Sequence, residues 1–253
     1  MHNPDAAFYF DLSSPLAYLA AERVLHTMPV ATEWQPVLAR ELRRTPTGVH
    51  ASNLAGTESF DAFRCHEEEQ IFHLEVERRA RELQLQQLRW PEPFPFDSTF
   101  AMRAATYAKS IGRIVAFTQA AFRQAFAGGR PLDVADNVLI AAAACEMHPS
   151  AVLKGAALRS VGEQLSAATA EAVSLGVRDV PAVRVGDRVF HGERTLEEAA
   201  AHALARAANA PPDANANTGA DTNADQYAGA HKTMDRAAAA KGTAAKDATT
   251  RSP

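Results

Sequence analysis

Cysteine is scarce in this chain, which has only Cys65 and Cys145 among its 253 residues. Two cysteines so far apart exclude a disulfide scaffold, a Cys-x-x-Cys redox motif and a four-cysteine zinc site. The chain also lacks a run near the ~18 apolar residues that span a membrane. Its first residues lack the basic and apolar parts of a secretory signal. We therefore expect a cytoplasmic protein that does not contact a membrane.

Neither sign of charge is in marked excess, since 26 lysine and arginine residues face 30 aspartate and glutamate residues, a net charge of -4. A surface built to coat nucleic acid or an acidic membrane would be strongly basic, so neither partner is expected. The hydrophobic fraction of 47% is ordinary for a globular protein and predicts a sizeable core.

Large apolar residues almost vanish after residue 206. The segment 207–253 contains no valine, isoleucine, leucine, phenylalanine or tryptophan, and only Tyr227 and Met234 are large and apolar. Such a segment cannot bury enough surface to offset its conformational entropy. The composition therefore predicts a disordered C-terminal tail.

The two ends of the remaining chain carry the strand signals. The apolar run 6–12 predicts a buried strand, a helix follows with Ser14 as N-cap, and residues 30–38 predict a second strand. After a block of mostly helical spacing, residues 177–190 predict a β-hairpin with a glycine-aspartate turn. The sequence Thr195-Leu-Glu-Glu then predicts a capping box at the start of a final helix.

This order of elements is that of a thioredoxin-like α/β domain, which we place at residues 6–40 and 160–206. A large all-helical insertion, DsbA-like in kind, occupies residues 41–159. A dithiol member of this fold carries Cys-Pro-x-Cys where this chain has Ser14-Pro-Leu-Ala17, so a dithiol oxidoreductase is not expected. Val180-Pro181 opens the hairpin where the fold places its cis-proline.

The segment Phe10-Asp-Leu-Ser-Ser-Pro-Leu-Ala-Tyr-Leu-Ala20 resembles the 2-hydroxychromene-2-carboxylate isomerases and the kappa-class glutathione transferases. The similarity continues through Trp90-Pro-Glu-Pro-Phe-Pro and covers most of residues 6–206. The resemblance implies a glutathione-dependent isomerase that acts on an unsaturated aromatic acid, as in aromatic degradation. It also implies that glutathione is the cofactor and that a homodimer forms.

Ser14 is the candidate catalytic residue. The first N–H groups of a helix are unsatisfied and carry partial positive charge, which stabilises a thiolate. Because serine supplies no sulfur of its own, that field is left for an external thiol, which the resemblance identifies as glutathione. The resemblance further implies that Pro15 and a cis Val180-Pro181 bond border the ligand, with the Val180 backbone pairing as in strand addition.

The resemblance adds further positions, with less support from the residues themselves. Asp97 lies where relatives commonly carry an asparagine that faces glutathione, and Glu193 and Arg194 lie where relatives hold the ligand's α-amino group with an acidic residue. Arginine cannot accept a hydrogen bond from an ammonium group, so Arg194 departs from that pattern. Trp90 and Phe94 are expected to form an apolar wall for the aromatic substrate.

Two other functions remain open at this stage. One is a kappa-like glutathione transferase, and the other is a non-catalytic thioredoxin-fold module that binds extended peptides, a hypothesis motivated by Arg194. No metal site is expected, because His66 and His73 would lie about two helical turns, or ~10 Å, apart, too far to share one ion.

Overall fold

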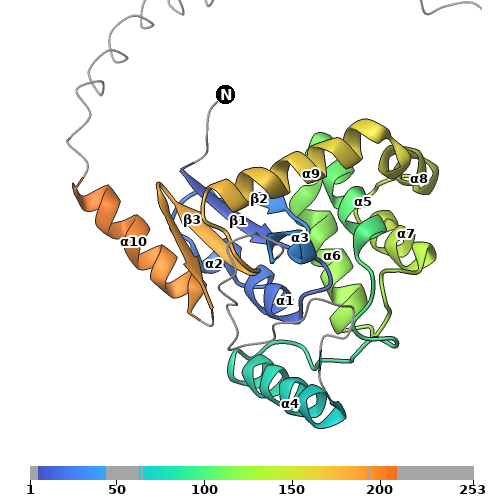
Figure 1. Cartoon of the computed structure of the whole chain (residues 1–253), viewed down its shortest axis with the longest axis horizontal. Coiled ribbons are helices and arrows are strands. Elements are labelled where there is room, and N and C mark those ends of the chain that lie inside the picture. The colour runs from blue at the N-terminus through green and yellow to red at the C-terminus, as the bar shows by residue number, and fades with distance from the viewer. Residues whose placement is uncertain (1–4, 44–62, 64, 193, 210–253) are drawn as a thin grey trace, which may run out of the picture. The chain divides into compact units, whose positions relative to one another are not determined.

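A four-stranded mixed sheet lies at the centre of the computed structural model, which describes residues 5–43, 63, 65–192 and 194–209 (Figure 1). The strand order is β2-β1-β3-β4. β1 pairs in parallel with β2 and antiparallel with β3, and β3 pairs antiparallel with β4. The strands are β1 Ala6–Phe10, β2 Glu33–Pro36, β3 Ala182–Val185 and β4 Arg188–His191.

Helices surround this sheet in the described part of the chain, and most of them lie between β2 and β3 in sequence (Figure 1). The helices are α1 Pro15–Ala21, α2 Val24–Thr27, α3 Ala39–Leu42, α4 His66–Glu82, α5 Thr99–Ser110, α6 Ile114–Phe126, α7 Ala135–Ala143, α8 Pro149–Ala157, α9 Arg159–Ser174 and α10 Thr195–Asn209. The thioredoxin-like domain with a large helical insertion is therefore confirmed as the fold class.

β1 is buried on both faces, which explains its unbroken apolar sequence. Phe8 and Phe10 belong to the core beneath the helical block, where the Phe10 ring lies 6.0 Å from that of Phe122. Tyr9 belongs to a second core on the other face, together with Val177 and Ala172 of the α9 region. Alternate residues of one short strand thus hold helices against both faces of the sheet.

The helical block is fastened to α1 by aromatic and ionic contacts. The Tyr18 ring on α1 stacks on Phe126 of α6 with centroids 5.7 Å apart. Arg123 of α6 donates two hydrogen bonds, of 2.8 and 2.7 Å, to Glu22 at the end of α1. Burial raises the pKa of Tyr18 to about 12, with the Glu22 charge adding to the rise and Arg123 opposing it. The Tyr18 phenol is therefore neutral at physiological pH.

Several boundaries differ from the sequence expectations, and the second strand is shorter than the predicted 30–38, at Glu33–Pro36. β1 ends at Phe10 because Asp11 turns the chain, and β3 begins only at Ala182, after the proline. The capping box is wrong: Thr195 is the first residue of α10, and its hydroxyl donates to the Gly192 carbonyl at 2.5 Å.

Residues up to Ala208 form one compact unit, so the predicted division into a thioredoxin-like domain and a helical domain stays a prediction. The predicted tail, residues 207–253, begins too early, because residues 207–209 belong to α10. The rest of it, from residue 210 on, lies outside the described residues.

Gly155 of α8 packs directly against the ring of Tyr107 on α5, where an added Cβ would lie 2.4 Å from a ring carbon. We predict that Gly155→Ala lowers the melting temperature, because overpacking costs about 1–3 kcal/mol and outweighs a helix-propensity gain of about 1 kcal/mol. Thermal denaturation measures the change. In a Tyr107→Ala background, which removes the ring atoms that the new Cβ would meet, the same substitution should be neutral or stabilising. An equal loss in both backgrounds would contradict this packing.

Candidate active site

Three segments of the chain come together at one edge of the sheet. Phe10 is the last residue of β1, and its parallel partner is Pro36 at the end of β2. Tyr9 pairs with Ala182, the first residue of the antiparallel β3. The loops that follow β1 and β2 and the loop that precedes β3 therefore emerge at the same edge. These loops carry Ser14, residues 37–43 and Val180-Pro181.

The buried carboxylate of Asp11 ties two of these loops together. Asp11 is 2% exposed. Its Oδ1 accepts hydrogen bonds from the Ser13 N–H at 3.0 Å and the Ser13 hydroxyl at 2.9 Å, and its Oδ2 accepts from the Ala39 N–H at 2.9 Å. Its backbone carbonyl also accepts from the Ser14 N–H at 3.0 Å. Asp11 thereby fixes the turn that leads into α1, a role that the sequence analysis missed.

Ser14 is the N-cap of α1, as predicted. Its Oγ accepts a hydrogen bond from the Ala17 N–H at 3.2 Å, and Pro15 occupies the first helical position. Because this bond uses a lone pair of Oγ, the hydroxyl proton is left to an acceptor outside the helix. Among the described residues the Ser14 hydroxyl has no such acceptor. Its catalytic role stays a prediction.

The Val180–Pro181 peptide bond is cis, which confirms the conformation expected from the sequence. The Val180 N–H donates to Oδ1 of Asp179 at 2.8 Å, and the same oxygen accepts from Nη2 of Arg43 at 2.8 Å. The backbone group that was expected to pair with the ligand is thus engaged within the chain. The binding role of Val180 and Pro181 remains a prediction.

The cis-proline loop is held on its other side by His191 of β4. Its Nε2 accepts a hydrogen bond from the Arg178 N–H at 3.1 Å. Burial lowers the pKa of His191, as does the nearby positive charge of Arg178, while the negative charge of Asp179 opposes the shift. The neutral ring is the form that can accept this hydrogen bond.

Asp97 lies near the same edge through its ion pair with Arg40 of α3, at 3.5 Å. The Oδ1 of Asp97 also accepts a hydrogen bond from the Thr99 N–H, at 2.9 Å, at the start of α5.

Glu193 and Arg194 are the two residues expected to hold the α-amino group of the ligand. Arg194 is exposed and has no ion-pair partner among the described residues. Glu193 lies outside the described residues.

Trp90 and Phe94 belong to an aromatic cluster between α4 and α6. The Trp90 ring stacks on His73 with centroids 3.6 Å apart, and its Nε1 donates to Glu77 at 2.8 Å. The Phe94 ring lies 5.0 Å from Trp90. Burial lowers the pKa of His73, against the opposing charges of nearby glutamates. Both predicted wall residues are partly buried, and their contact with a substrate stays a prediction.

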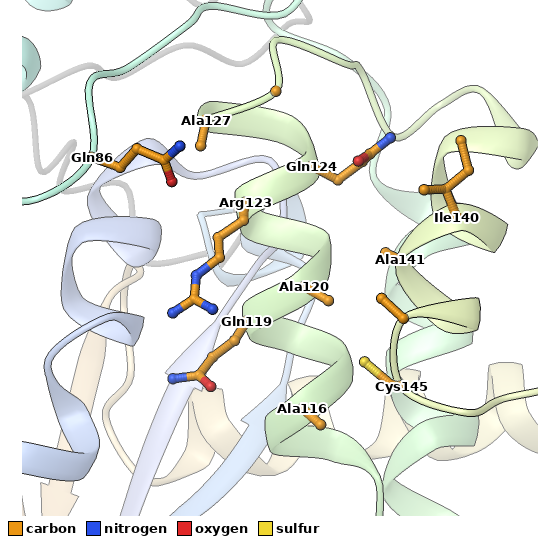
Figure 2. A pocket seen from close by; sticks show the side chains of 12 residues that line it. Gln86, Ala116, Gln119, Ala120, Arg123, Gln124, Ala127, Ile140, Ala141 and Cys145 are labelled. Carbon is orange, nitrogen blue, oxygen red and sulfur yellow. The ribbon is translucent and has the colours of Figure 1, made fainter.

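A hollow of about 590 Å³ lies elsewhere, along α6 and α7, and includes none of the predicted site residues. In Figure 2 Gln124 points toward α7, whereas Gln119 and Arg123 point to the opposite side of α6.

Within the described ranges, no group of three or more histidine, cysteine, aspartate or glutamate side chains could hold a metal ion. The helices of those ranges include none that is long and apolar enough to cross a membrane.

The sheet order, the cis-proline and the serine-capped α1 define a thioredoxin-like protein. More specifically, residues 7–205 match the DSBA-like thioredoxin domain, and the chain belongs to that family.

Solved structures of similar fold include a 2-hydroxychromene-2-carboxylate isomerase, with TM-score 0.67, 18% identity and coverage of 80% of this chain and 97% of that one. A probable DsbA oxidoreductase from Streptomyces coelicolor follows, with TM-score 0.61, 18% identity and coverage of 82% and 91%. The cytosolic disulfide reductase DsbM from Pseudomonas aeruginosa, solved with GSH, has TM-score 0.50, 11% identity and coverage of 80% and 98%. No curated protein sequence matches the chain.

We predict that Asp11→Asn lowers the free energy of unfolding by about 1–3 kcal/mol, because the new amide group faces an N–H donor and leaves it without an acceptor. Chemical denaturation measures the loss. Asp187→Asn, in the exposed turn between β3 and β4, is the matched control and should change stability by no more than about 0.5 kcal/mol. Equal stability of the Asp11 variant and the wild type would contradict the assigned role.

Proposed function

We propose that the protein is a glutathione-dependent isomerase of the 2-hydroxychromene-2-carboxylate type, or a close relative that acts on another unsaturated aromatic acid. The observation that carries the proposal is Ser14, which caps α1 at the sheet edge that also holds the cis Val180–Pro181 bond. A cytoplasmic location, an aromatic substrate and a homodimer belong to the same proposal. The similar fold of an isomerase structure is consistent with it.

The residues at this edge fit glutathione in charge and in hydrogen bonding. The Ser14 hydroxyl offers a donor to a thiolate, and hydrogen bonds to charged groups are the stronger ones. Arg40 lies in α3 and Arg43 is the residue that ends it. Their guanidinium groups pair with Asp97 and Asp179 and are half-exposed, at 49% and 41%. Guanidinium groups bind carboxylates with matched geometry, and glutathione carries two.

When bound, glutathione would supply a thiolate that adds to the conjugated double bond of the substrate, permits rotation there and leaves again. In the chain, the Ser14 hydroxyl and the start of α1 stabilise the negative charge on sulfur. The cis-proline loop orients the peptide backbone of the ligand beside Ser14. Trp90 and Phe94 supply apolar surface for the aromatic acid.

The alternatives differ in what they require of the site. A kappa-like glutathione transferase needs the same thiolate site, with a different second substrate. A peptide-binding module is favoured by Arg194, and it requires no thiol. A dithiol oxidoreductase is disfavoured, because Ala17 stands at the second cysteine position and Cys145 is buried, with its thiol pKa raised by that burial.

We predict that Ser14→Ala weakens binding of reduced glutathione by about tenfold or more, because a hydrogen bond to a charged group contributes about 1.5–3 kcal/mol. Calorimetric titration of the full chain measures the affinity. The ultraviolet absorbance of the thiolate, which grows on binding to the wild type, should not grow with the variant.

Ser14→Thr is the matched control, since threonine keeps both the helix cap and the hydroxyl. Ser14→Gly separates the loss of the thiolate donor from the loss of the cap, because glycine lacks the hydroxyl but costs an N-cap only a few tenths of a kcal/mol, against about 1 kcal/mol for alanine. If Ser14→Ala binds glutathione and turns over substrate as the wild type does, the role of Ser14 is wrong. If the wild type does not bind but Arg194→Asp does, Arg194 has disabled the site and the peptide-binding module becomes the better reading.

A further inference from the structure

The Val180 N–H and the side chain of Asp179 form a contact that the proposed function does not use. Val180 is 5% exposed, and a buried N–H group needs an acceptor in any folded state. The structure supplies that acceptor from the preceding residue, at 2.8 Å. A ligand that pairs with Val180 as an added strand must therefore take the place of the Asp179 oxygen.

Arg43 holds the Asp179 carboxylate in that position. Its Nη2 donates to the same Oδ1 that accepts from Val180, also at 2.8 Å, across 136 positions of sequence. Both side chains are well exposed, Arg43 at 41% and Asp179 at 44%. Exposed ion pairs are weak and exchange readily with other partners, so a carboxylate from solution can compete for Arg43.

The backbone around this contact is held independently of Asp179. The Arg178 N–H is bound by His191, and Pro181 leads directly into β3, whose first residue pairs with β1. Rotation of the Asp179 side chain alone would therefore expose the Val180 N–H without moving the loop.

We propose that Asp179 determines specificity: its side chain occupies the Val180 N–H and is displaced by thiol peptides whose carboxylate pairs with Arg43 in its place. We call this contact of Asp179 with Val180 and Arg43 the latch. The latch rests on the proposed binding of glutathione at Ser14. A peptide with a free carboxylate offers Arg43 a replacement partner while its own backbone carbonyl accepts from Val180. An esterified peptide lacks that replacement and must break the Arg43–Asp179 contact unaided. The site therefore favours acidic thiol peptides over their esters.

The test compares calorimetric titrations of reduced glutathione and of its diethyl ester, using the full chain and three variants. Asp179→Ala removes the latch and should lower the Kd for the ester by about three- to tenfold, the range of one net hydrogen bond. Asp179→Asn removes the charge but keeps an oxygen that can accept from Val180, so affinity for the ester should stay near that of the wild type. Asp187→Ala is the matched control for loss of an exposed aspartate.

A simple charge effect gives a different pattern. Both Asp179 variants would then gain affinity for anionic glutathione equally, and neither would gain affinity for the ester. Hydrogen exchange of the Val180 amide gives a readout without ligand, and it should be faster in Asp179→Ala than in Asp179→Asn.

The remaining outcomes separate the two proposals. If the wild type binds glutathione and Asp179→Ala leaves ester affinity unchanged, the latch is wrong and the proposed function stands. If neither the wild type nor Asp179→Ala binds glutathione, the proposed function at Ser14 fails and the latch fails with it.

Discussion

The hydrogen bonds to the buried Asp11 carboxylate are the constraint on which the arrangement of this site depends. A carboxyl group that is nearly inaccessible to water must have its oxygens satisfied within the protein, and here the donors come from two segments, at Ser13 and Ala39. The turn that places Ser14 at the head of α1 and the start of α3, the helix that carries Arg40, are thus fixed by one side chain. The geometry of both follows from the cost of leaving a buried polar group without hydrogen-bond partners.

Local sequence was sufficient for the parts of the structure that are decided locally. A serine followed by proline at the start of an apolar helical pattern is a strong helix-start signal, and Ser14 caps α1 as expected. The strand–helix–strand start and the terminal hairpin follow from periodicity and turn residues. The fold then fixes where Val180-Pro181 must lie, and the cis bond agrees with that placement.

The contacts that shape the candidate site could not be predicted, because they join distant parts of the chain. The Arg43–Asp179 pair is one example, and the hydrogen bond from Ala39 to Asp11 is another. A charged residue inside an otherwise apolar run was the available signal for Asp11, but it does not identify the partner. The capping box failed for a related reason: the Gly192 carbonyl competes for the Thr195 hydroxyl, and no pattern within the helix reveals that turn.

The contacts between α6 and α1 have a consequence for how this part of the molecule moves. The ring stack of Tyr18 on Phe126 and the double hydrogen bond between Arg123 and Glu22 join the helical block to the helix that begins at Ser14. A hinge between these parts would have to break both contacts, and such collective motions take microseconds to milliseconds. Rotations of exposed side chains take picoseconds to nanoseconds. A hinge at this junction is therefore slower than the rotamer changes of exposed side chains around Ser14.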